Sequence, residues 1–90
     1  MGCNVIQERY TAVPMDVDTT RVFEYSDSIG GFLAVTAGNI SITRVGDTGA
    51  VLPVVTALPV VVGFNRIPVF LGTYGGTVTL TNGASGSLLV

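Results

Sequence analysis

The stretch NISITRV, at residues 39–45, decides the fold class because its side chains alternate between apolar and polar. Its two isoleucines fall on one side and its Ser and Thr on the other, the period-two pattern of a strand with one buried face. Residues 32–36 before it predict another strand, and Ala37-Gly38 predicts a tight turn between the two.

Similar blocks continue along the chain, separated by Gly-containing turns, and after residue 20 no helical period runs without a Gly or Pro interrupting it. Turns every 8–12 residues without a helical period are typical of an all-β sandwich or barrel. We therefore expect an all-β fold, a small antiparallel β-sandwich or barrel of jelly-roll-like character, with an extended N-terminal arm. A loop is expected at residues 26–31, and the expected strands are residues 21–25, 32–36, 39–45, 50–56, 58–64, 67–71, 77–81 and 87–90.

Three prolines constrain where these strands can lie. Pro53, Pro59 and Pro68 each fall inside or at the start of a strand block. Proline has no N–H to donate to a neighbouring strand, so we expect these positions at sheet edges, bulges or strand starts.

Charge divides the chain into two parts. Seven of the ten charged residues lie in residues 1–27, and only Arg44, Asp47 and Arg66 follow. A free monomer normally spreads charge over its surface, and a β-rich surface with few charges invites pairing with other chains. We interpret residues 1–20 as an arm that packs along its own domain or onto a neighbour, and residues 21–90 as a single β domain. The whole is expected to be part of an assembly.

Composition argues against several classes of function. The net charge is −2 and there is no Lys, whereas binding nucleic acid needs clustered cations. No run of about 20 apolar residues is present, so we expect no membrane span. Cys3 is the only cysteine, which leaves no intrachain disulfide and no thiolate cluster for a metal. We expect no cofactor, and synthesis in the cytoplasm because no secretory signal is visible.

Catalytic chemistry is poorly supplied. The chain has no His, which excludes Ser-His-Asp and Cys-His schemes, and the segment GASG at residues 83–86 is better interpreted as a hairpin turn than as a nucleophile elbow. We therefore expect no enzyme and no catalytic residues. Asp16, Asp18, Glu24 and Asp27 could form an acid/base pair or a Ca²⁺ site, but their spacing does not fit a Ca²⁺ loop. The simpler interpretation is a polar start to the domain, with Asp in turns.

Two arginines suggest polar contacts between chains. Arg44 and Arg66 lie beside apolar strand residues, where a guanidinium could pair with a carboxylate across a chain boundary. A pairing of Arg44 with Asp47 within the chain is equally open. Tyr and Phe are interpreted as packing residues rather than as a sugar-stacking platform.

The run FLAVTAGNISIT at residues 32–43 is followed by the turn GDTG at 46–49, the strand GFNRIPV at 63–69 and the turn at residues 72–73. This texture of short Thr/Val/Ile strands joined by Gly turns resembles small virion proteins of tailed bacteriophages. Capsid decoration proteins and head-spike base proteins are the most similar. The resemblance covers about residues 20–85.

The resemblance implies a structural, non-enzymatic subunit on the capsid exterior, made in the host bacterial cytoplasm. Its partners would be the major capsid protein or other virion proteins, and it would be a homo-oligomer, a trimer or pentamer. A tail, neck or fibre-adaptor component is the nearest alternative, and a carbohydrate-binding β-module a more distant one. The residues expected at the partner interface are Val5, Ile6, Tyr10 and Val13 in the arm, with Arg66 as a polar anchor.

Overall fold

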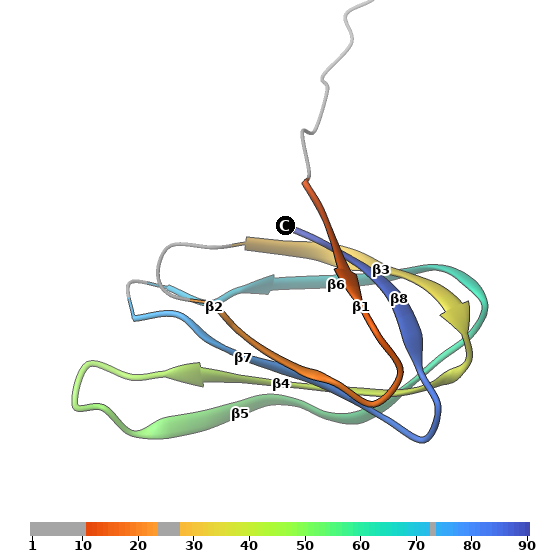
Figure 1. The fold of residues 1–90 in the computed structure, drawn as a ribbon. Coiled ribbons are helices and arrows are strands. Elements are labelled where there is room, and N and C mark those ends of the chain that lie inside the picture. The colour runs from red at the N-terminus through yellow and green to blue at the C-terminus, as the bar shows by residue number, and fades with distance from the viewer. Residues whose placement is uncertain (1–10, 24–27, 73) are drawn as a thin grey trace, which may run out of the picture.

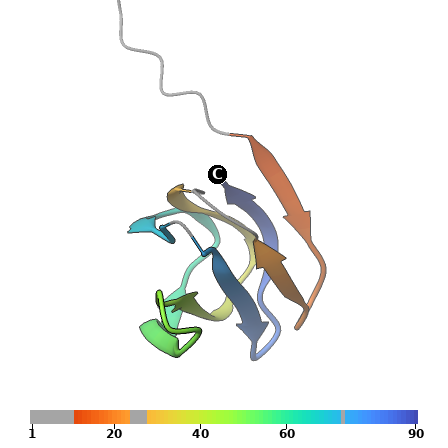
Figure 2. The same ribbon diagram turned by 90° about the vertical axis from the view of Figure 1, so that its left-hand side faces the viewer.

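The computed structural model describes residues 11–23, 28–72 and 74–90 of the 90-residue chain. These residues form two four-stranded antiparallel sheets that pack against each other (Figures 1 and 2). The strands are β1 (Ala12–Met15), β2 (Thr20–Phe23), β3 (Ser28–Thr36), β4 (Gly38–Val45), β5 (Val51–Val60), β6 (Gly63–Phe70), β7 (Gly76–Thr81) and β8 (Ser85–Leu89).

The strand order is that of a jelly roll. Sheet A has the order β1-β8-β3-β6 and sheet B has the order β2-β7-β4-β5. The first strand thus pairs with the eighth, the second with the seventh, the third with the sixth and the fourth with the fifth. One long hairpin folded over itself produces this pattern, which defines the double-sheet jelly roll. The expected all-β fold is confirmed, and of the two architectures left open the chain forms the sandwich.

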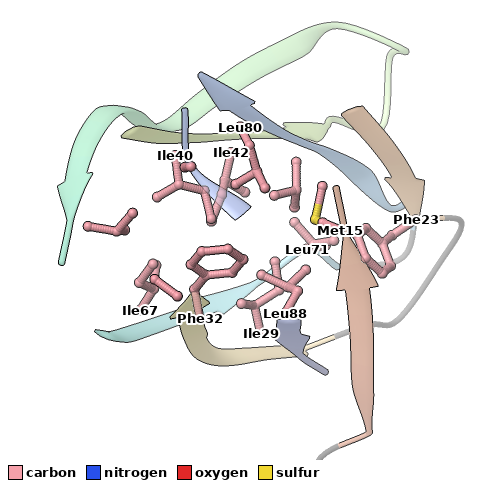
Figure 3. Close-up of a cluster of buried hydrophobic side chains, with 14 residues drawn as sticks. Met15, Phe23, Ile29, Phe32, Ile40, Ile42, Ile67, Leu71, Leu80 and Leu88 are labelled. Atoms are coloured by element: carbon pink, nitrogen blue, oxygen red, sulfur yellow. The ribbon is translucent and has the colours of Figure 1, made fainter. Parts of the chain in front are cut away.

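The core lies between the sheets and contains only apolar side chains among the residues described. Phe32 of β3 occupies its centre and is fully buried, with Ile40 and Ile42 of β4 on the opposite sheet (Figure 3). The alternation at residues 39–45 is therefore confirmed, since both isoleucines point inward. Burying one such side chain stabilises the fold by about 1.5–3 kcal/mol. The complete core is Met15, Phe23, Ile29, Phe32, Ala34, Ile40, Ile42, Val60, Ile67, Leu71, Val78, Leu80, Ala84 and Leu88.

All four prolines of the chain lie on edge strands. Pro14 is in β1, Pro53 and Pro59 are in β5, and Pro68 is in β6. The expectation for the last three is confirmed. An edge strand has one side without a sheet partner, so a missing N–H can be accommodated there, and proline also hinders another strand from pairing with that edge.

The prediction of two strands at residues 50–56 and 58–64 is wrong. One strand, β5, continues from Val51 to Val60 through two register shifts against β4, and Ala57 has a left-handed φ of 48°. The pairing survives because side chains of β4 bind the irregular backbone: Asn39 Nδ2 donates to the Ala57 carbonyl at 3.1 Å, and the Ala57 N–H donates to Ser41 Oγ at 2.9 Å. The chain reverses only afterwards, at Gly63 with φ 108°.

Part of the segment predicted as a loop at residues 26–31 is also strand. β3 begins at Ser28, and its Ile29 is a core residue with 2% exposure. A register shift against β6 between Ile29 and Gly31 explains the glycines, because an irregularity inside a strand favours Gly as much as a loop does.

The domain begins inside the segment predicted as an arm. β1 pairs with β8, and Met15 at its end is 5% exposed and part of the core. From Thr11 onward the predicted arm therefore packs along its own domain, one of the two alternatives left open. Residues 1–10 lie outside the described part of the chain.

Candidate assembly surfaces

The two central strands of sheet B, β7 and β4, carry short polar side chains on its outer face, with the exposed Val22 of β2 beside Thr77. Thr79 of β7 lies in register between Thr20 of β2 and Ser41 of β4, and its hydroxyl is 3.3 Å from that of Thr20. Hydroxyl and amide groups can exchange hydrogen bonds with water in either direction, so this surface suits solvent. We call it the hydroxyl face, and its residues are Thr20, Asn39, Ser41, Thr43, Thr77, Thr79 and Thr81.

The outer side of sheet A has the opposite character over β3 and β6. Leu33 and Phe64 are register partners on these strands and are 46% and 57% exposed. Val35 lies two residues after Leu33, and Val62 two residues before Phe64. They are 69% and 67% exposed. Together with Val61, which precedes Val62 in the β5–β6 turn, they expose on the order of 500 Å² of mainly apolar surface, the size of the largest and often functional apolar patch of a monomer. We call Leu33, Val35, Val61, Val62 and Phe64 the apolar face.

Asn65 holds the turn that presents this face. Its Oδ1 accepts the N–H of Val61 at 3.0 Å, and its Nδ2 donates to the carbonyls of Val61 (2.8 Å), Gly63 (3.0 Å) and Phe32 (3.2 Å). One side chain thus ties the β5–β6 turn both to itself and to the neighbouring strand β3. A surface fixed in this way loses little conformational entropy when it is covered.

Phe64 lies close to a glycine across the sheet. A Cβ atom at Gly31 would lie 2.6 Å from ring carbon Cε1 of Phe64 and 2.6 Å from the backbone oxygen of Asn65. The ring therefore lies against the bare backbone of Gly31, where any other residue would displace it. Its exposed side remains available to a partner.

A second apolar area lies at the other end of the sandwich, on the hairpin between β4 and β5. Val51 is 66% exposed, and an open groove of about 430 Å³ beside it is lined by Arg44, Asp47, Leu52 and Tyr74 among others. Backbone hydrogen bonds hold this hairpin, from Gly46 to Ala50 at 2.8 Å and from Val45 to Gly75 at 2.9 Å. We call residues 44–52 with Tyr74 the hairpin end. It combines apolar contacts with both charge signs.

The structure places only two of the residues expected at the interface. Arg66 is exposed on β6, follows Phe64 on the same side of the strand, and lies at the rim of the apolar face in register with Gly31. Val13 instead pairs with Leu88 and packs partly buried against the core of its own chain. Val5, Ile6 and Tyr10 lie outside the described residues.

Sequence reasoning missed the residues of the apolar face. The signal was present in the uninterrupted apolar runs at residues 32–35 and 60–62. When a strand carries no polar-apolar alternation, both of its faces are apolar. One face packs on the core of the domain, and the other needs a different surface to cover it.

Of the four acidic residues considered for a metal or acid/base site, Asp18 has a role in a turn. Its Oδ1 accepts the N–H of Gly83 at 2.8 Å, and its own φ is 55°. Glu24 and Asp27 lie outside the described residues. Within the described part of the chain, no three Asp, Glu, Cys or His side chains gather where a metal ion could bind.

No helix capable of crossing a membrane occurs in the part of the chain that the structure describes. In comparisons with known proteins, no family model, no curated protein and no solved structure matches this chain.

Proposed function

We propose that the protein is a structural virion protein of a tailed bacteriophage, a capsid decoration or cement protein or a head-spike base protein that binds the major capsid protein. The observation that carries the proposal is the difference between the outer faces of the two sheets. A free monomer has water on both faces, whereas a subunit seated in a particle has one face covered. A hydroxyl face opposite an apolar face suits the second situation.

The scarcity of charge supports the same function. Residues 28–90 contain three charged groups, and all three belong to the hairpin end or to the rim of the apolar face. Burial of apolar side chains would supply the affinity, and Arg44, Asp47 and Arg66 would fix orientation through hydrogen-bonded contacts. Many weakly bound copies on one particle would then act together through avidity.

We assign the contact with the capsid to the hairpin end. It projects from one end of the sandwich (Figure 1) and offers Val51 and Leu52 together with two opposite charges. A heterotypic contact needs such polar groups for specificity, because apolar burial alone does not select a partner.

The experiment is a cosedimentation of the purified protein with expanded heads that were assembled without it, and in parallel with tail intermediates. We expect saturable binding to heads at a fixed number of copies, reduced at least about tenfold by Val51→Asp. Val22→Asp is the matched control, because Val22 is 69% exposed but lies beside the hydroxyl face. Binding to tails alone would replace the decoration role by a tail or neck role, and binding to neither particle would overturn the proposal.

The arm is tested separately. Removing residues 1–10 leaves β1 intact, since that strand begins at Ala12. If Val5, Ile6 and Tyr10 contact a neighbouring subunit, this truncation weakens binding to heads without unfolding the domain. Unchanged binding would remove the arm from the interface.

A carbohydrate-binding module is the second candidate, favoured by one observation. Tyr74 is 52% exposed at the groove that Arg44 and Asp47 also line. An exposed aromatic ring beside a carboxylate and a guanidinium can stack on a sugar and hydrogen-bond its hydroxyls. Glycan-array signals that disappear with Tyr74→Ala would support this candidate, and an array without signals would remove it.

A further inference from the structure

We propose that a second copy of this chain covers the apolar face, so that the β3–β6 side of one subunit packs against another subunit. The inference deepens the proposed function and rests on it in treating the chain as a repeated subunit. It assigns the two apolar areas to different partners, with the apolar face for a copy of the chain and the hairpin end for the capsid.

The area of the apolar face agrees with contact between copies. Its five side chains expose on the order of 500 Å², so two such faces in full contact remove at most about 1,000 Å² from water before any rim residue is counted. That total reaches the lower limit for a specific interface. With Pro68 and Arg66 at the rim added, it approaches the standard size.

The lack of charge on the apolar face also favours a second copy of the chain as its partner. All five of its residues are neutral and apolar, and Arg66 is a single cation at the rim of a chain with net charge −2. A partner recognised through charge would find no complement there, whereas two neutral apolar faces complement each other. An anionic lipid surface is disfavoured for the same reason, because such surfaces attract clusters of Lys and Arg.

The contact would be made by side chains rather than by adding a strand to the sheet. β5 and β6 are the two edge strands on this side of the sandwich, and three prolines interrupt their free edges. Strand addition needs a continuous row of N–H and C=O groups, which Pro53, Pro59 and Pro68 break. The rigid turn held by Asn65 and the ring of Phe64 on Gly31 instead present fixed side chains for packing.

The test is sedimentation equilibrium of the purified protein alone, across a range of concentrations and without heads. The wild type is expected to associate into two or more copies, and Val35→Asp to weaken that association by about 100-fold, because a charge would be buried without a partner. Val22→Asp is the matched control: both valines are 69% exposed, but they lie on opposite outer faces. Val62→Asp, in the turn outside any strand, repeats the test where no sheet pairing can be disturbed.

Each result decides the question. Association that is lost with Val35→Asp and Val62→Asp but kept with Val22→Asp supports the proposal, provided that circular dichroism shows all variants folded. Apolar contact also predicts that raising NaCl does not weaken the association. A wild type that stays monomeric, or equal effects of Val35→Asp and Val22→Asp, would overturn the proposal. Head binding is measured separately with Val51→Asp, so the two proposals can fail independently.

Discussion

Asn65→Asp tests most directly how the β5–β6 turn is held. The substitution keeps the size and shape of the side chain, and it keeps the Oδ1 that accepts the N–H of Val61. It replaces Nδ2, a donor that faces the carbonyl oxygens of Phe32, Val61 and Gly63, by an oxygen that can only accept. Three carbonyls would then face a carboxylate instead of an N–H donor.

The magnitude follows from the number of donors lost. The two hydrogens on Nδ2 are shared among hydrogen bonds to three carbonyls. Each hydrogen bond contributes about 1 kcal/mol to stability. Repulsion between the new oxygen and the partly buried carbonyl of Phe32 adds to this loss. We expect the free energy of unfolding to fall by about 3 kcal/mol, which in a domain of this size lowers the melting temperature by roughly 10–20 °C.

The chain contains its own control. Asn39 also accepts one hydrogen bond, from Asn82 Nδ2, but its own Nδ2 donates only to the Ala57 carbonyl, so Asn39→Asp should cost about 1 kcal/mol. Urea unfolding followed by far-ultraviolet circular dichroism, at one low protein concentration, measures both variants. A loss below about 1 kcal/mol for Asn65→Asp, or equal losses for the two variants, would refute the role given to Asn65.

Two further predictions concern the packing of the domain. Gly31→Ala should lower the free energy of unfolding by about 2 kcal/mol or more, because the new Cβ would overlap the ring of Phe64 and the backbone of Asn65. The control is Gly46→Ala, whose Cβ would come no closer than 3.4 Å to Leu52. This variant should be nearly as stable as the wild type in the same urea titration. Removing residues 1–15 should destabilise the domain by about 2–5 kcal/mol more than removing residues 1–10, because it also deletes β1 and the core residue Met15. Equal stabilities of the two truncated proteins would contradict the place of β1 in sheet A.

The alternation of apolar and polar residues predicted strands well where one face is buried and the other is exposed to solvent. Residues 39–45 and 77–81 alternate cleanly, and both segments form strands whose polar side chains lie on the hydroxyl face. The prediction at residues 50–64 was wrong because it divided one strand in two at Ala57. Contacts from Asn39 and Ser41, distant in sequence, keep β5 continuous instead. Tertiary contacts of this kind have no local signature.

The candidate surfaces were less accessible to prediction. An apolar run such as residues 32–35 indicates a strand buried on both faces, but it does not tell whether the second cover comes from the same chain or another. The role of Asn65 depends on the left-handed turn at Gly63 and on the pairing of β3 with β6. Arg66 lies at the rim of the apolar face, and its role as a polar anchor stays a prediction.

A density map of the assembled particle would show what covers each face of the sandwich. We predict that Val35 and Phe64 pack against a neighbouring copy, while Thr79 and the rest of the hydroxyl face point to solvent. A map with the apolar face in water, or with the hydroxyl face buried against the shell, would rule out contact between copies through β3 and β6.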